Sequence, residues 1–131
     1  MNVLDTTVLV YATGTDQPFL DPCRELVSAI TAGRLSATTT VEVIQEFAHV
    51  RARRYRRADA AALAKDFIKV LAPLVRVTAD ELRLGLVLFE HVDGLGSFDA
   101  VLAAASLGSA DALVSADRVF GSVPELTHFV P

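Results

Sequence analysis

The chain begins with an apolar run over residues 2–10 that contains a carboxylate, Asp5. A run rich in Val and Leu is typical of a buried strand in an α/β sheet. A carboxylate buried there is costly unless a cation or hydrogen-bond donors compensate its charge. In an open α/β sheet, ligands bind outside the carboxyl ends of the strands, where Asp5 and the hydroxyls of Thr6 and Thr7 would emerge. The alternative is that Asp5 or a threonine caps a following helix.

Length and composition predict a single ordered domain over residues 1–131, because 52% of the residues are hydrophobic and 21% are charged. The mean hydropathy of +0.42 is high for a soluble protein and indicates an extra buried surface, such as a partner interface. The net charge of −4 excludes a uniformly basic surface. Any contact with nucleic acid would therefore need a local basic patch.

The single cysteine, Cys23, cannot form an intrachain disulfide and fits a reducing cytoplasm. The amino-terminal residues lack the basic region of a signal peptide, and no later stretch reaches the roughly 20 apolar residues of a membrane span. We therefore expect a soluble protein that is retained in the cytoplasm, with Cys23 as a buried thiol without chemistry.

Apolar periodicity predicts helices that alternate with short strands. The first helix would begin at Asp21-Pro22 and end near Gly33, and a second would start at Thr39 or Thr40 and continue into the arginines that follow. Further helices are expected over residues 58–71, 79–91 and 97–108, and strands over residues 35–38, 75–77, 112–114 and 128–130. This alternation predicts an α/β fold with a mostly parallel central sheet and helices on both faces.

Several carboxylates fall at the ends of these predicted elements or on one helix face. Asp5 ends the first strand, Glu42 and Glu46 share one face of the second helix, Asp99 lies in the first turn of a later helix, and Asp117 follows a late strand. Carboxylates that converge at one sheet edge repel each other unless a divalent cation holds them. Their oxygens are the ligands that Mg²⁺ or Mn²⁺ prefers, so the sequence predicts a metal site.

Other kinds of site have little support in the sequence. The three histidines, His49, His91 and His128, lack the spacing of zinc ligands. No glycine-rich phosphate loop and no nucleophile elbow is present.

Four short motifs resemble the PIN-domain ribonucleases, and among them the VapC-type toxins of bacterial toxin–antitoxin pairs. They are Leu4-Asp5-Thr6, Gln45-Glu46-Phe47, Phe98-Asp99-Ala100 and the segment from Leu113 to Arg118, in the order that this family shows. The resemblance spans nearly the whole chain. It implies a PIN-like fold, a Mg²⁺-dependent endoribonuclease activity, a VapB-type antitoxin partner and a homodimer.

The resemblance also implies roles for individual residues. Asp5 and Asp99 would hold the ion, and Glu46 and Asp117 would position or deprotonate the attacking water. The hydroxyls of Thr6 and Ser115 would orient the carboxylates.

Two departures from the family pattern leave alternatives open. Glu42 lies one helical turn from Glu46 and could be the ligand on that helix. Asp111 shares the last motif region with Asp117, and we interpret it as a turn residue before the strand. The Phe47 context favours Glu46.

A basic cluster provides the local positive patch that RNA binding needs. Arginines at five positions surround Tyr55: Arg51, Arg53, Arg54, Arg56 and Arg57. Arginine can contact phosphate through two hydrogen bonds, and tyrosine can stack on a base. The alternative is a solvated helix face that forms salt bridges.

We therefore expect a Mg²⁺-dependent endoribonuclease toxin. One rival is a catalytically silent PIN-like scaffold that binds RNA or a partner protein. Another is a receiver-type phosphotransfer domain, which also gathers carboxylates at a sheet edge. That class needs a lysine after a late strand, whereas Lys65 and Lys69 both lie in a mid-chain helix.

Overall fold

The computed structural model describes all residues, 1–131. Its strands are β1 (Asn2–Leu4), β2 (Ala37–Thr38), β3 (Ala112–Val114) and β4 (His128–Phe129). Its α-helices are α1 (Thr6–Ala12), α2 (Leu20–Thr31), α3 (Val41–Arg54), α4 (Arg57–Leu71), α5 (Ala79–His91) and α6 (Ser97–Ser109), and a 3₁₀ helix, η1, spans Arg118–Ser122. None of the helices is long and apolar enough to cross a membrane.

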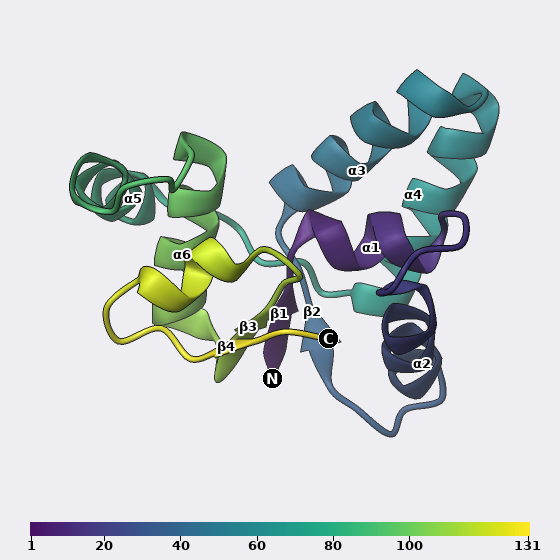
Figure 1. Ribbon diagram of the computed structural model, residues 1–131, viewed down its shortest axis with the longest axis horizontal. Coiled ribbons are helices and arrows are strands. Elements are labelled where there is room, and N and C mark those ends of the chain that lie inside the picture. Colours follow the sequence, from purple (N-terminus) through teal and green to yellow (C-terminus); the bar gives the residue numbers. More distant parts are fainter.

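The strands form one sheet in the order β2-β1-β3-β4, and every pair is parallel. Helices α1 to α4 gather on one side of the sheet, and α5 and α6 lie on the other side (Figure 1). This arrangement confirms the predicted α/β class. Because all strands run the same way, the carboxyl ends of β1 and β3 meet at one edge, where Asp5 follows β1 and Ser115 follows β3.

The core forms where the sheet meets these helices. Val3, Leu4 and Leu113 are fully or almost fully buried in the two central strands. The rings of Phe47 in α3 and Phe67 in α4 meet edge to face, with centroids 5.1 Å apart. Burial in this core raises the pKa of the Cys23 thiol to about 11, which keeps the sulfur protonated and unreactive, as expected.

The predictions of local structure were correct where side chains provide caps. Thr40 accepts a hydrogen bond from the backbone N–H of Val43 at 3.1 Å and so begins α3. Thr78 and Glu81 form the predicted capping box of α5. The turn after α2 uses the predicted Gly33, whose φ of 75° lies in the left-handed region.

The ends of several elements differ from those that the sequence predicted. The opening run is a strand only to Leu4, because α1 begins at Thr6 and its apolar side, including Val8 and Leu9, packs into the core. Residues 75–77 form no strand: Val75 makes a single parallel bridge to Thr40. The helix after Thr40 ends at Arg54, and the first helix begins at Leu20, slightly before Asp21-Pro22.

Candidate active site

Asp5 lies between β1 and α1 with an extended backbone (φ −80°, ψ 160°). Although this is the N-cap position of α1, its side chain makes no capping hydrogen bond. Its Oδ2 instead accepts hydrogen bonds from Ser115 Oγ at 2.6 Å and from Thr7 Oγ1 at 2.9 Å. The capping alternative is therefore wrong, and hydroxyl donors hold this buried carboxylate in place.

A small network joins these hydroxyls to the loop after β3. Ser115 Oγ accepts from the backbone N–H of Asp117 at 3.0 Å, and Thr7 Oγ1 accepts from the backbone N–H of Ala116 at 3.1 Å. The prediction of Ser115 as an orienting hydroxyl agrees with this geometry. The second hydroxyl is Thr7, and the expected Thr6 makes no hydrogen bond to Asp5. The sequence alone could not distinguish Thr6 from Thr7, because the start of α1 decides which of the two side chains turns toward the end of β3.

The two oxygens of Asp5 have different surroundings. Both hydroxyls donate to Oδ2, and no hydrogen bond engages Oδ1. Asp5 as a residue is only 3% exposed, yet the chain has no buried side-chain oxygen without a partner, so Oδ1 reaches solvent. A fixed carboxylate with one free oxygen suits a divalent cation, which binds carboxylates through single oxygens and retains water.

Asp99 lies in the first turn of α6 and is the most strongly perturbed carboxyl group of the chain. Its pKa is raised to about 7, first by burial and then by the negative charges of Asp5, Glu46 and Asp117. Charges that act on one carboxyl group in this way lie close to it, so the four carboxylates face a common region. The structure thus brings together the four acidic residues that the sequence selected.

These carboxylates converge without closing into a tight ligand shell. No three Asp, Glu, His or Cys side chains come close enough together to hold one ion between them. The donor chemistry nevertheless fits Mg²⁺ or Mn²⁺, because these ions keep several waters and need only one or two carboxylates directly. Asp5 and Asp99 could hold such an ion, since Asp5 offers a free oxygen and the negative form of Asp99 is disfavoured by burial and then by its acidic neighbours.

The two glutamates of α3 have different surroundings. Glu46 is partly buried and its charge acts on Asp99, whereas Glu42 is exposed and does not contribute to that pKa shift. The structure therefore favours Glu46 as the acidic residue that α3 contributes to the site.

The two aspartates near β3 are likewise distinguished. Asp117 acts on Asp99, and its Oδ1 also caps η1 by accepting from Val119 N–H at 3.1 Å. Asp111 lies at the opposite end of β3 and pairs with the amino-terminal ammonium group.

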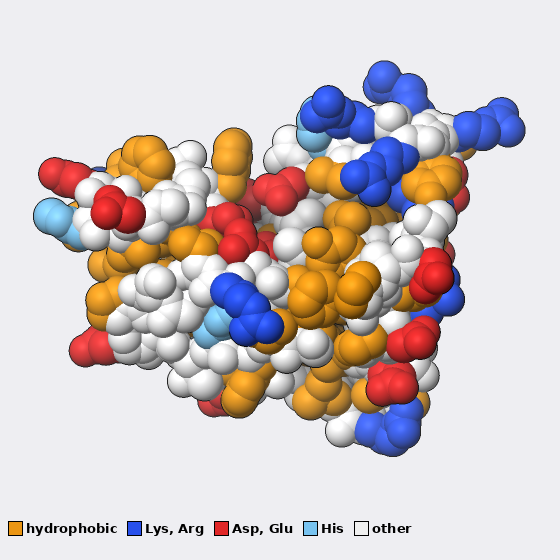
Figure 2. Space-filling model, in the orientation of Figure 1, with side chains coloured by type: hydrophobic (Ala, Val, Ile, Leu, Met, Phe, Trp, Pro, Cys, Tyr) orange, Lys and Arg blue, Asp and Glu red, His pale blue; other side chains and the backbone are white.

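The acidic residues gather in a hollow between the α1–α4 side and the α5–α6 side of the molecule (Figure 2). The sequence matches the PIN domain family over residues 3–126. It is also 52% identical to Ribonuclease VapC7 of Mycobacterium tuberculosis (strain ATCC 25618 / H37Rv) over 136 residues, which cover 100% of this chain and 92% of the relative. This chain belongs to the PIN domain family and is of the VapC type.

A solved structure resembles this PIN domain with a TM-score of 0.76, covering 99% of this chain and 98% of the other. It is the crystal structure of VapBC2 from Rickettsia felis bound to a DNA fragment from their promoter. The sequence identity is 16%, so this likeness concerns the fold alone. Family membership removes the receiver-type phosphotransfer domain from consideration.

The predicted RNA-binding arginines of this PIN domain lie where α3 ends and α4 begins, and basic side chains crowd that end of the molecule in Figure 2. Four of them are exposed: Arg53, Arg54, Arg56 and Arg57. Arg51 differs, because only 14% of its side chain is exposed and its guanidinium is bonded within the chain. The structure thus gives no support to Arg51 as a direct RNA contact.

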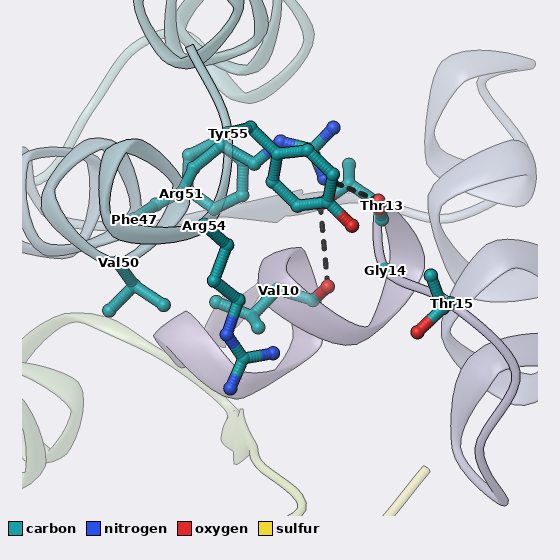
Figure 3. Close-up of a pocket in the computed structure, with 9 residues that line it drawn as sticks. All are labelled: Val10, Thr13, Gly14, Thr15, Phe47, Val50, Arg51, Arg54 and Tyr55. Carbon is teal, nitrogen blue, oxygen red and sulfur yellow. Dashed lines mark hydrogen bonds between the residues drawn. The ribbon is translucent and has the colours of Figure 1, made fainter. Parts of the chain in front are cut away.

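Figure 3 shows a small pocket beside this basic cluster, at the opposite end of α1 from Asp5. Its wall includes Val10, Phe47 and Val50, with Arg54 and Tyr55 at its edge. The volume is about 30 Å³, which is enough for roughly one water molecule. It is therefore a packing defect next to the arginines and no substrate cavity.

Proposed function

We propose that the chain, as one domain over residues 1–131, is a divalent-metal-dependent endoribonuclease and the toxic component of a type II toxin–antitoxin pair in the cytoplasm. One observation carries this proposal: Asp5, fixed by two hydroxyls with one oxygen free, faces the same region as Asp99, Glu46 and Asp117. Identity of 52% to a protein named as a ribonuclease supports RNA as the substrate.

Each acidic residue has a role that follows from its surroundings. Asp5 and Asp99 would hold Mg²⁺ or Mn²⁺, and the ion when bound supplies an acidified water and a positive charge that offsets the phosphate. Glu46, which is partly buried and whose charge acts on Asp99, would accept the proton of the attacking water. Asp117 would orient that water, because its backbone is already fixed by Ser115.

Two partners complete the proposal. A VapB-type antitoxin is supported by the fold likeness to a VapBC complex. Acidic residues of such an antitoxin could pair with the exposed arginines of this chain. A homodimer is supported by α5, whose Gly85 packs against Val101 of α6 while its outer side exposes large apolar residues. These residues are Leu82, Leu84, Leu86, Val87 and Phe89.

The homodimer has a direct test. Phe89→Glu would place a charge in the apolar surface of α5, and we expect the protein to shift from dimer to monomer in light scattering. Ala62→Glu adds the same charge at an exposed position on α4, serves as the charge control and should leave the dimer in place. A dimer that survives Phe89→Glu would place the interface elsewhere.

The function is tested by incubating the purified protein with total cellular RNA, with and without Mg²⁺, and sequencing the new RNA ends. Discrete cuts that need the ion and vanish in Asp5→Asn support the proposal. RNA binding without any cleavage in Mg²⁺ or Mn²⁺ would favour the silent scaffold. Cleavage that persists unchanged after removal of divalent ions would contradict the metal site.

A further inference from the structure

Arg51 makes three contacts that join separate elements of the fold. Its Nε donates to Asp59 Oδ2 in the first turn of α4 at 2.7 Å, and its Nη1 donates to the carbonyl oxygen of Thr13 at the end of α1 at 2.6 Å. Its guanidinium also covers the ring of Tyr55, 3.6 Å from the centroid. Figure 3 shows Arg51 reaching across to Thr13 beside the Tyr55 ring. We call Arg51, Tyr55 and Asp59 the arginine bracket.

The junction that this bracket spans has little local support of its own. Only Tyr55 and Arg56 separate α3 from α4, and both are extended. Arg56 occupies the N-cap of α4 without a side-chain capping bond, and no glycine or proline shapes the turn. The N-terminus of a helix carries partial positive charge, so Arg56 and Arg57 also lie at an unfavourable position.

Residues that violate local helix preferences are often retained for function. The bracket offsets the violation here, because Asp59 supplies negative charge to the first turn of α4 and Arg51 ties that turn to α3. Arg51 also satisfies a free carbonyl at the end of α1, where cations are favoured. The Arg51 guanidinium therefore helps to fix how α3 and α4 are oriented at their junction, and with it the direction in which the four exposed arginines point.

We propose that Arg51 is a positioning residue for RNA binding: through the bracket it holds Arg53, Arg54, Arg56 and Arg57 in register with the acidic hollow. Helix α1, with 7 residues, separates the bracket from Asp5 by about 10 Å. RNA whose phosphate lies in the acidic hollow would reach the exposed arginines along this helix. The inference rests on the proposed function, since it assumes that RNA is the substrate.

Asp59→Asn gives the sharpest test, because the two explanations predict opposite signs. If charge alone matters, loss of a carboxylate beside the arginines should strengthen RNA binding. If the bracket positions the arginines, the same change should weaken binding by about tenfold and flatten its salt dependence. Asp66→Asn is the matched control, since Asp66 is exposed on the same helix and forms no ion pair. RNA affinity would be measured across a salt series with Mg²⁺ in a non-cleaving Asp5→Asn background.

Arg51→Lys tests the same point with the charge retained. Lysine cannot donate in two fixed directions while stacking on Tyr55, so we expect KM for RNA to rise with kcat little changed. Arg76→Lys, at an exposed arginine outside the basic cluster, is the control and should behave as wild type. Thermal unfolding would establish that each variant is folded at the assay temperature.

The outcomes separate this inference from the function on which it rests. Weaker binding in Asp59→Asn and a higher KM in Arg51→Lys, with both controls near wild type, support the positioning role. Tighter or equal binding in Asp59→Asn, in a protein that cleaves RNA, overturns the positioning role and leaves the proposed function intact. A wild-type protein that neither binds nor cleaves RNA would overturn both.

Discussion

Helix α1 has an acidic end and a basic end, and the two are built in different ways. At the start of the helix, Asp5 is buried and held by hydroxyls from two segments, Thr7 and Ser115. At its end, the carbonyl of Thr13 meets Arg51, beyond which four arginines extend into solvent. The acidic end is buried and held by hydroxyls from two segments, whereas the arginines of the basic end are exposed on α3 and α4.

The difference matches what each end is proposed to do. A site that holds an ion needs oxygens at fixed positions in a region of reduced solvation. A surface that binds RNA phosphates needs positive charge on long side chains. Exposure to water weakens such binding less than it would weaken binding of the ion. Changes at the acidic end should therefore abolish cleavage, whereas changes at the basic end should weaken binding by degrees.

The largest effect is expected at the acidic end. Asp5→Asn and Asp99→Asn should each lower RNA cleavage by roughly a hundredfold to a thousandfold, since each replaces a negatively charged ligand of the proposed ion with a neutral amide. Both variants should stay folded, because Asn preserves the side-chain shape. Cleavage rates and circular dichroism spectra measure the two effects. Near-normal cleavage by either variant would remove that residue from the site.

A second prediction concerns the acidic residue that α3 contributes. Glu46→Gln should lower kcat by about a hundredfold, because Glu46 is partly buried and acts on Asp99. Glu42→Gln is the matched control, one turn away and exposed, and should stay within about twofold of wild type. Steady-state kinetics on one RNA decide between them. The reverse ranking would move the functional residue back by one turn.

A third prediction concerns the basic end. Replacing both Arg53 and Arg54 with Ala should weaken RNA binding by about tenfold and lower the salt dependence by about two charges. Metal affinity should hardly change, since the acidic end is untouched. RNA titrations across a salt series in the Asp5→Asn background measure this. If the variant and the Asp5→Asn protein have equal RNA affinities and equal salt dependence, these arginines contact the antitoxin or only solvent.

The smallest expected effect is on stability, and it has a definite sign. The pKa of Asp99 in the folded chain, about 7, lies above its ordinary value of 3.8. Between these values the folded state binds a proton that the unfolded state has lost, so without divalent ions this group lowers stability as pH rises from about 4 to about 7.

Asp99→Asn removes this pH dependence, because Asn carries no charge. Without divalent ions, we expect the variant to melt a few degrees above wild type at pH 8 and close to it at pH 4. Thermal unfolding of both proteins at several pH values provides the measurement. Melting temperatures of the two proteins that differ by the same amount at every pH would show that the pKa of Asp99 is not raised in the folded chain.

The sequence by itself determined the fold class, and it predicted which four acidic residues would face each other. Alternating strands and helices predict a parallel sheet, and carboxylates that follow its strands must meet at one edge, as Asp5 and Asp117 do. Local caps such as Thr40 and Thr78 were also predictable, because a hydroxyl and a backbone N–H a few residues away interact whatever the rest of the chain does.

Only the tertiary structure decided which hydroxyl holds Asp5 and which of the five clustered arginines is bonded within the chain. From the sequence alone, Thr6 and Thr7 are equally good candidates for the hydroxyl that bonds to Asp5. The path of the chain from β1 into α1 turns Thr7 toward Ser115, 108 residues away. Arg51 looks like its neighbours until α1, α3 and α4 come together around it. Both outcomes depend on contacts between segments that are distant in the sequence, and such contacts cannot be predicted from the spacing of residues along the chain.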